Sequence, residues 1–196
     1  MTTKQSIMVF VYPVIKLISK LFKKNMQISQ SQTASKTSFY DLSMKKSSGE
    51  NLDLTTLKNK KILIVNTASD CGFTPQYDGL QKLYDENNSD LVVIAFPSND
   101  FGEQEKKNDL AIEDFCKVNF GVTFPLMSKS TVVKNAEQNE VFKWLTDSSK
   151  NGWNDKAPSW NFCKYLIDEN GNLTHFFEAA IEPTDNKIID AIKSKN

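Results

Sequence analysis

The order of apolar and polar residues from position 38 onward alternates between two periods. Unbroken apolar runs within 60–69 and 90–98 are rich in β-branched residues, which is typical of strands buried on both faces of a sheet. Apolar residues at helical spacing predict helices within 108–120 and 137–147. Strands that alternate with helices predict an α/β domain with a central mixed β-sheet flanked by helices in three layers.

Two further helices are expected to begin at recognisable residues. Thr74 is predicted to cap a helix whose first position is Pro75, because proline has no backbone N–H to leave unpaired there. The last helix, within 183–194, is expected to start at Pro183 or Thr184.

Two β-hairpins are also predicted. Residues 38–57 form a short one, and residues 160–180 form a second. The tip of the second carries Asn170 and Gly171, the pair that is typical of a type I′ turn because both tolerate positive φ.

The first 35 residues differ from the rest. Residues 1–35 are predicted to form an N-terminal tail, an apolar and basic segment followed by a polar linker, ahead of a domain over 36–196. The nine apolar residues 7–15 are too few to span a bilayer, which needs about 20. A lysine at every fourth position from Lys16 to Lys24 makes a basic amphipathic pattern suited to a membrane surface. A signal-peptide core and a disordered tail are the alternatives. The expected compartment is the cytoplasm, with membrane association or export left open.

Composition narrows the classes of function. A chain of 196 residues is long enough for one domain with a buried core. All 24 basic residues are lysines, which lack the planar fork with which arginine grips phosphates, so no nucleic-acid partner is expected. The lone histidine, His175, is expected to be a surface or packing residue. With three cysteines and no CxxC pair, neither a metal site nor a disulfide-stapled scaffold is expected.

Cys71 follows the first buried strand and precedes the helix expected at Pro75. In open α/β sheets, this end of a strand usually presents ligands and reactive groups. Backbone N–H groups at a helix amino terminus favour a thiolate, so the pKa of the Cys71 thiol is expected to be lowered and its sulfur to be a nucleophile. The adjacent Gly72 would let a substrate approach closely. The alternative is an inert, buried cysteine.

Four segments carry a resemblance to a known family. NTASDCGFTPQYDGLQKLY, AFPSNDFGEQE, FCKVNFGVTFPLMSK and WNFCKYLID stand in the order and spacing of the glutathione peroxidases. From Ser38 to Ile192 the chain resembles a cysteine-containing, non-selenium member. The resemblance implies a thioredoxin-like fold, the reduction of hydroperoxides, and a catalytic set that matches Cys71, Gln104, Trp160 and Asn161.

The residue types in this set suit the chemistry that the resemblance implies. A thiolate that attacks an O–O bond leaves negative charge first on sulfur and then on the departing oxygen. Trp160 offers an indole N–H donor, and the amides of Gln104 and Asn161 donate without adding a charge that would have to be buried.

The sulfenic acid left on Cys71 must then be reduced. In the branch of the family that thioredoxin regenerates, the resolving cysteine lies in a helix before an FP motif, and Cys116 matches that position. The resemblance therefore implies a Cys71–Cys116 disulfide, and because its Cα atoms must come within about 7 Å, the helix is expected to open locally. Cys116 as a core residue is the alternative. Cys163 is expected to be structural, pointing with Asn161 and away from Trp160 on a strand, with a role as a second resolving thiol left open.

The absence of arginine also bears on the reductant. Family members that prefer glutathione surround the site with basic side chains, arginines among them, so a thioredoxin-type protein is favoured over glutathione. Residues 148–159 are short compared with the inserted loop of tetrameric relatives, which favours a monomer. The predicted function is reduction of hydrogen peroxide and organic hydroperoxides, without a cofactor or metal. A peroxide sensor or relay that oxidises a partner protein, and a non-catalytic binding module, are the alternatives.

The chain departs from the family pattern at Ser98, Asp100, Lys106 and Cys163. FPSNDFG stands where FPCNQFG is usual, so Ser98 and Asp100 replace a cysteine and a glutamine. A carboxylate at Asp100 that lay close and unpaired would disfavour the Cys71 thiolate. Lys106 stands where a proline is customary.

Overall fold

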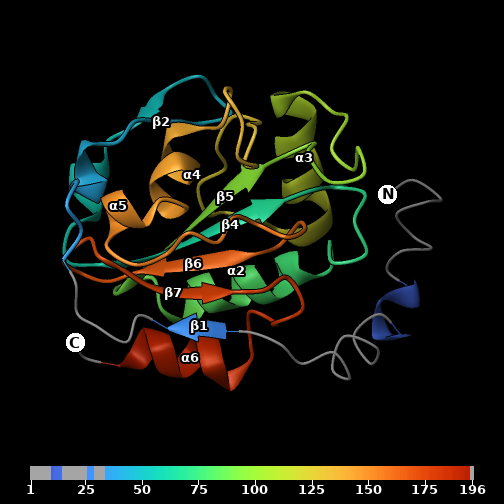
Figure 1. Ribbon diagram of the computed structural model, residues 1–196. Helices are drawn as coiled ribbons and strands as arrows, with labels where there is room; N and C mark the ends of the chain where they lie inside the picture. The colour runs from blue at the N-terminus through green and yellow to red at the C-terminus, as the bar shows by residue number, and fades with distance from the viewer. Residues whose placement is uncertain (1–9, 15–25, 29–33, 195–196) are drawn as a thin grey trace.

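The computed structural model describes residues 10–14, 26–28 and 34–194. The basic pattern from Lys16 to Lys24 lies outside these residues. A five-stranded sheet runs through the middle of the molecule in the order β1-β7-β6-β4-β5 (Figure 1). Its strands are β1 (Met26–Ile28), β4 (Lys61–Thr67), β5 (Leu91–Pro97), β6 (Lys164–Ile167) and β7 (Leu173–Phe177).

The two parallel strands carry the unbroken apolar runs. β4 pairs in parallel with β5 and antiparallel with β6, so the sheet is mixed, as predicted. Every residue of β4 and β5 is buried, because helices or loops cover both faces. Parallel pairing places the carboxyl ends of the two strands, Thr67 and Pro97, side by side. The loops that follow them therefore leave the sheet at the same edge.

Helices cover both faces, which confirms the predicted α/β class and its three layers (Figure 1). The first face packs against α2 (Gln76–Glu86), α3 (Asp109–Phe120) and α6 (Asn186–Lys193). The second face packs against η1 (Phe39–Asp41), η2 (Leu54–Leu57) and α4 (Glu140–Leu145), which α5 (Ser148–Asn151) follows. The predicted short hairpin is formed by β2 (Met44–Lys45) and β3 (Asn51–Leu52).

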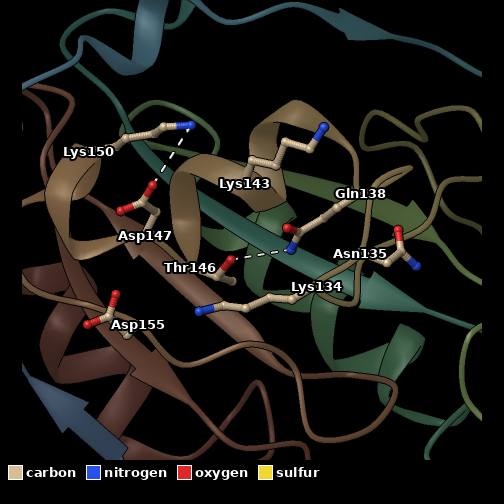
Figure 2. A pocket seen from close by; sticks show the side chains of 8 residues that line it. All are labelled: Lys134, Asn135, Gln138, Lys143, Thr146, Asp147, Lys150 and Asp155. Carbon is tan, nitrogen blue, oxygen red and sulfur yellow. Dashed lines mark hydrogen bonds and ion pairs between the residues drawn. The ribbon is translucent and has the colours of Figure 1, made fainter.

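The helical layer on the second face contains a hollow of about 330 Å³ beside α4 and α5 (Figure 2). At its base, Nε2 of Gln138 donates to the hydroxyl of Thr146 over 3.3 Å, and both residues are buried. Lys150 lies 3.9 Å from Asp147, so the lysines around the hollow are interspersed with carboxylates. Its lining consists of Lys134, Asn135, Gln138, Lys143, Thr146, Asp147, Lys150 and Asp155.

Both predicted helix starts are wrong in detail. α2 begins at Gln76 with Pro75 at the cap position and no capping side chain. The hydroxyl of Thr74 instead accepts from the N–H of Cys71 over 3.1 Å and donates to a backbone carbonyl before it. It serves the turn rather than the helix. α6 begins at Asn186 and is capped by the carboxylate of Asp185, which outcompetes the earlier threonine because it accepts from a backbone N–H of the first turn.

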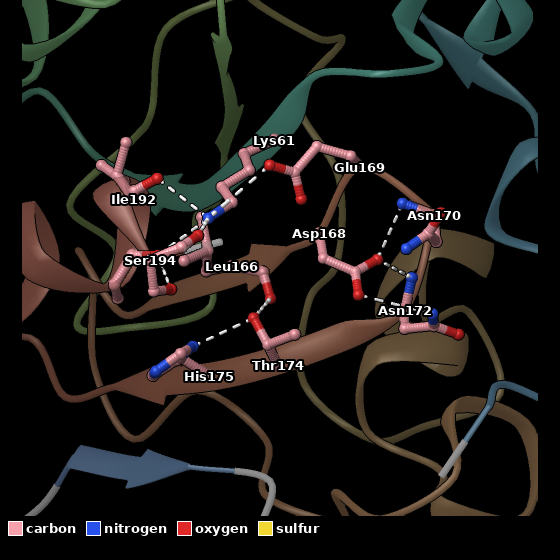
Figure 3. A network of polar contacts seen from close by, with 11 residues as sticks. Lys61, Leu166, Asp168, Glu169, Asn170, Asn172, Thr174, His175, Ile192 and Ser194 are labelled. Carbon is pink, nitrogen blue, oxygen red and sulfur yellow. Dashed lines mark hydrogen bonds and ion pairs between the residues drawn. The ribbon is translucent and has the colours of Figure 1, made fainter. Parts of the chain in front are cut away.

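The second hairpin forms between β6 and β7, but its turn is not type I′. That turn requires positive φ at both central residues, and only Gly171, at 83°, has it. The carboxylate of Asp168 accepts from the N–H groups of Asn170 (3.0 Å) and Asn172 (2.8 Å), which holds the turn in another form (Figure 3). A side-chain acceptor therefore overrides the preference of the Asn-Gly pair.

Lys61, the first residue of β4, is only 3% exposed and ties α6 to the sheet (Figure 3). Its ammonium donates to the carbonyls of Ala191 (3.2 Å) and Ile192 (2.9 Å), and also to that of Ser194. Glu169 adds an ion pair at 3.7 Å. A cation at the carboxyl end of a helix satisfies carbonyls that have no partner within the helix.

The N-terminal segment contributes an edge strand. β1 pairs antiparallel with β7, although it falls within the predicted N-terminal tail, at the start of its polar linker. The division at residue 35 remains a prediction. Among the residues that the structure describes, no helix is both long and apolar enough to cross a bilayer. His175 on β7 stacks on Phe177, with ring centroids 5.5 Å apart, and burial lowers its pKa to about 4, which confirms the expected packing role.

Candidate active site

Cys71 lies in the turn between β4 and α2, at the carboxyl end of the parallel strands. Its Sγ accepts a hydrogen bond from the N–H of Phe73 over 3.4 Å. Its backbone N–H donates to the hydroxyl of Thr74 over 3.1 Å. The residue is 0% exposed. Burial raises the pKa of the Cys71 thiol above its ordinary value, while the donors around the sulfur act in the opposite direction. The expected lowering of this pKa is therefore wrong, because removal from water outweighs the N–H groups at the start of α2.

Two of the other three predicted residues, Trp160 and Asn161, lie at the sulfur, and Gln104 is hydrogen-bonded to Asn161. The indole of Trp160 and the amide of Asn161 lie within hydrogen-bonding reach of Sγ of Cys71. As donors, both stabilise the thiolate form of this sulfur. Nδ2 of Asn161 also donates to Oε1 of Gln104 over 3.0 Å. Trp160 is 39% exposed and packs against Phe101, with ring centroids 5.7 Å apart. The structure thus brings the four residues together at one end of the sheet.

Asn161 leaves one polar atom of this site free. The residue is 0% exposed, and its Oδ1 has no hydrogen-bond partner among the residues that the structure describes. A buried acceptor without a donor is costly to leave unpaired. Its position in the same site as the Cys71 sulfur would let it accept the proton of an entering hydroxyl or hydroperoxyl group.

Asn66 of β4 positions the tryptophan and the asparagine, and sequence reasoning missed it. Its Nδ2 donates to the carbonyl of Trp160 over 3.0 Å, and its Oδ1 accepts from the N–H of Cys163 over 3.0 Å. Its backbone carbonyl accepts from Phe162, which has φ of 70°, a left-handed conformation that is strained for a bulky residue. The feature of the sequence that could have identified Asn66 is a polar amide near the end of a largely apolar strand.

Glu105 positions Gln104 and was also missed. It is 0% exposed, and its Oε2 accepts from both the N–H and the hydroxyl of Ser69 over 2.7 Å each. Burial raises the pKa of this carboxyl. The carbonyl of Gln104 accepts from the N–H of Asp70 over 3.0 Å. These hydrogen bonds join two loops next to Cys71. The feature of the sequence that could have identified Glu105 is its position directly after Gln104.

Cys116 lies on α3, in the same apolar cluster on the first face as Cys71. It is 0% exposed, and burial raises the pKa of its thiol to about 12, with Tyr77 acting in the opposite direction and Glu105 adding to the rise. All three cysteines carry free thiols. Inside the intact helix, the Cys116 sulfur is protonated and out of contact with solvent.

Cys163 lies in the apolar cluster on the second face, so the sheet separates it from Cys71. Its Sγ lies 3.7 Å from the hydroxyl of Ser159 and 3.9 Å from Oε2 of Glu178. The expectation that it shares a strand with Asn161 is wrong, because β6 begins only at residue 164 and Asn161 lies in a turn. Its placement favours a structural role.

Both charged residues that depart from the family pattern in this loop, Asp100 and Lys106, are paired. Oδ2 of Asp100 accepts from the N–H groups of Val132 (2.6 Å) and Val133 (3.1 Å), so this carboxylate is paired with backbone. Lys106 forms an exposed ion pair with Glu103 at 2.7 Å.

The hollow of Figure 2 contains none of the four predicted residues. Within the described part of the chain, no group of three or more His, Cys, Asp or Glu residues could hold a metal ion.

Comparison with known proteins bears on this site. A family model described as glutathione peroxidase matches residues 39–146. A glutathione peroxidase homolog, BsaA, of Staphylococcus epidermidis is 44% identical over 147 residues, which cover 74% of this chain and 92% of the relative. Glutathione peroxidase-like peroxiredoxin 2 of Saccharomyces cerevisiae is 42% identical over 149 residues, which cover 76% and 91%.

Solved structures of other proteins also resemble this chain in fold. The crystal structure of Trgpx in apo form has a TM-score of 0.62 at 36% identity and covers 82% of this chain and 98% of that one. A DsbF homologue from Corynebacterium diphtheriae has a TM-score of 0.60 at 15% identity, covers 86% and 94%, and shows the fold alone. Together they confirm the thioredoxin-like fold.

Proposed function

Because this chain belongs to the glutathione peroxidase family and is a thiol peroxidase, we propose that Cys71 is its peroxidatic sulfur and Cys116 its resolving thiol. The observation that supports this most strongly is the arrangement at Cys71, where the indole of Trp160 and the amide of Asn161 act on the sulfur and Gln104 is hydrogen-bonded to Asn161. Uncharged donors converge where negative charge develops.

In the first step, the sulfur of Cys71 attacks the outer oxygen of a hydroperoxide. The S–O bond forms as the O–O bond breaks, which yields a sulfenic acid on Cys71 and releases water or an alcohol. The thiol proton ends on the departing oxygen. The resting thiol is buried and its pKa is raised, so the sulfur must lose its proton during the attack. Meanwhile the free Oδ1 of Asn161 accepts a hydrogen bond from the O–H of the hydroperoxide and holds that proton in place.

In the second step, the thiol of Cys116 attacks the sulfenic sulfur of Cys71. An S–S bond forms and water leaves, with no change in the total number of electrons. Cys116 is buried in α3 with Phe115, so the helix must open locally to let the two sulfurs meet. The same opening exposes its thiol to water and removes the burial that raises its pKa.

A dithiol protein of the thioredoxin type then reduces the disulfide by two exchange steps, one for each sulfur. The absence of arginine favours this reductant over glutathione, which carries two carboxylates. The relatives named glutathione peroxidase-like peroxiredoxins are consistent with a protein reductant. The short segment 148–159 is consistent with a monomer.

The test is peroxide consumption by the full chain with thioredoxin, thioredoxin reductase and NADPH. We expect Cys71→Ser to abolish it, and Cys163→Ser, which changes a thiol on the other face of the sheet, to leave it intact. Turnover retained by Cys71→Ser would refute the assignment.

A further inference from the structure

Lys107 contacts a chain neighbour of each of the two proposed redox cysteines. Its ammonium pairs with Oδ1 of Asp70 at 3.8 Å, and Asp70 directly precedes Cys71. The same ammonium lies over the ring of Phe115, 5.1 Å from the ring centroid, and Phe115 directly precedes Cys116. One side chain therefore connects the turn that holds Cys71 with the helix that holds Cys116.

The backbone at Lys107 is itself held in place. Its carbonyl accepts from the ammonium of Lys129 over 2.5 Å, and Oδ1 of Asp109 accepts from the N–H of Lys129 over 2.8 Å. The side chain of Asn108 caps α3 by accepting from the N–H of Ala111 over 3.0 Å. The amino-terminal end of α3 is thus fixed, and the side chain of Lys107 reaches from this end to a ring in the middle of the helix.

The two contacts of Lys107 lie where water is partly excluded. The side chains of Lys107 and Asp70 are 27% and 22% exposed, and Phe115 is 8% exposed. An ion pair and a cation over an aromatic ring, at this degree of exposure, together change an equilibrium constant about fivefold. Contacts of this strength do not determine the fold, but they do affect how often one part of a helix opens.

Opening of α3 is part of the proposed resolving step. Cys116 is 0% exposed inside the helix, so its sulfur can meet the oxidised sulfur of Cys71 only after this part of α3 opens. Because Phe115 is the adjacent residue of the same turn, opening also carries its ring away from the ammonium of Lys107. The closed helix therefore keeps a contact that the opened helix loses, and this contact favours the closed form.

We propose that Lys107 is a latch on α3 and a positioning residue for the resolving step. By holding Phe115 to the turn at Asp70, it limits how often Cys116 becomes accessible and so sets the rate at which the sulfenic acid on Cys71 becomes a disulfide. A slower resolving step lengthens the life of the sulfenic acid, during which a second hydroperoxide can oxidise it to a sulfinic acid. The inference rests on the proposed roles of Cys71 and Cys116.

The first measurement reports the opening of α3 in the reduced full chain. Alkylation of Cys116 by iodoacetamide is followed by mass spectrometry, and Cys163, buried on the second face, is the internal reference for global unfolding. We expect Lys107→Ala to raise the alkylation rate of Cys116 relative to that of Cys163 about fivefold. Lys107→Arg, which keeps a cation that can pair with Asp70 and lie over the ring, should restore the wild-type ratio.

The adjacent lysine provides the matched control. Lys106 pairs with Glu103 at 2.7 Å, and both side chains are exposed. Lys106→Ala removes the same charge one position earlier in the chain, so it should leave the ratio of alkylation rates unchanged.

The second measurement follows a single turnover with one equivalent of hydrogen peroxide. Lys107→Ala should form the Cys71–Cys116 disulfide about fivefold faster than the wild type, while the oxidation of Cys71 changes less than about twofold. If the alkylation ratio stays at the wild-type value, or if the disulfide forms no faster, the latch is refuted and the proposed function stands. If the wild type itself forms no Cys71–Cys116 disulfide, the proposed function fails.

Discussion

Asn161 donates a hydrogen bond from Nδ2 to Oε1 of Gln104 over 3.0 Å, although 57 positions separate the two residues in the chain. A residue next to each is anchored: Asn66 of β4 donates to the carbonyl of Trp160, and the buried carboxylate of Glu105 accepts from Ser69. The pair therefore joins the loop after β5 to the turn before β6. Their mutual hydrogen bond holds the two amides together before a hydroperoxide arrives.

Removal of the Asn161 amide is expected to slow the chemical step. Asn161→Ala should lower the rate constant for oxidation of Cys71 by hydrogen peroxide about a hundredfold, because a donor to the sulfur and the departing oxygen is lost. Stopped-flow measurement of the first turnover gives this constant. Gln81→Ala, which removes an exposed amide of α2, is the control. Gln104→Ala provides a second variant at a less buried position, and unchanged rates in both would contradict the role of the pair.

Cys116 is expected to be needed for repeated turnover and not for the first. Cys116→Ser should consume about one equivalent of hydrogen peroxide and then stall with a thioredoxin-type reductant, because no thiol on the first face remains to trap the sulfenic acid. Mass spectrometry should find an oxidised Cys71. Cys163→Ser, whose sulfur lies on the second face, should cycle normally. Sustained thioredoxin-dependent cycling by Cys116→Ser would show that another group resolves the intermediate.

The pH dependence of Cys71 reactivity follows from its raised pKa. Only the thiolate is nucleophilic, and a raised pKa leaves the sulfur protonated at neutral pH, so reactivity should increase with pH. In a Cys116→Ser, Cys163→Ser background, the rate of alkylation by iodoacetamide should rise from about pH 6 to about pH 9 without levelling off. A rate already constant above about pH 6 would mean that the sulfur is held ionised, contrary to the structure.

The sequence predicted the elements whose signals are local. The unbroken apolar runs identified β4 and β5, and Cys71 was placed correctly at the end of β4. The amide and indole partners came from a resemblance, since no periodicity connects Gln104 with Asn161. Their proximity depends on two loops that meet only when the sheet is assembled, with β6 paired beside β4.

The errors share a physical cause, which is that tertiary contacts override local preference. Burial of Cys71 reverses the expected direction of its pKa shift, and that burial depends on side chains from distant loops. Thr74 resembles a helix cap in sequence, yet its hydroxyl is used by the turn around Cys71. At the hairpin, the carboxylate of Asp168 determines the turn and not the Asn-Gly pair that follows it.

The stability of the domain is expected to depend on Lys61 more than on other lysines. Its ammonium reaches the last carbonyls of α6 from the buried start of β4, where water cannot replace it. Lys61→Met keeps the apolar stem but removes the donor to these carbonyls, of which that of Ala191 keeps a second donor in the hydroxyl of Ser194, so we expect the free energy of unfolding to fall by about 2 kcal/mol. Lys60→Met is the matched control, because Lys60 donates to the carbonyl of Asn88 at an exposed position, and such changes usually stay within about 0.5 kcal/mol. Urea unfolding followed by circular dichroism measures both. Equal losses in the two variants would mean that α6 is held by its apolar face alone.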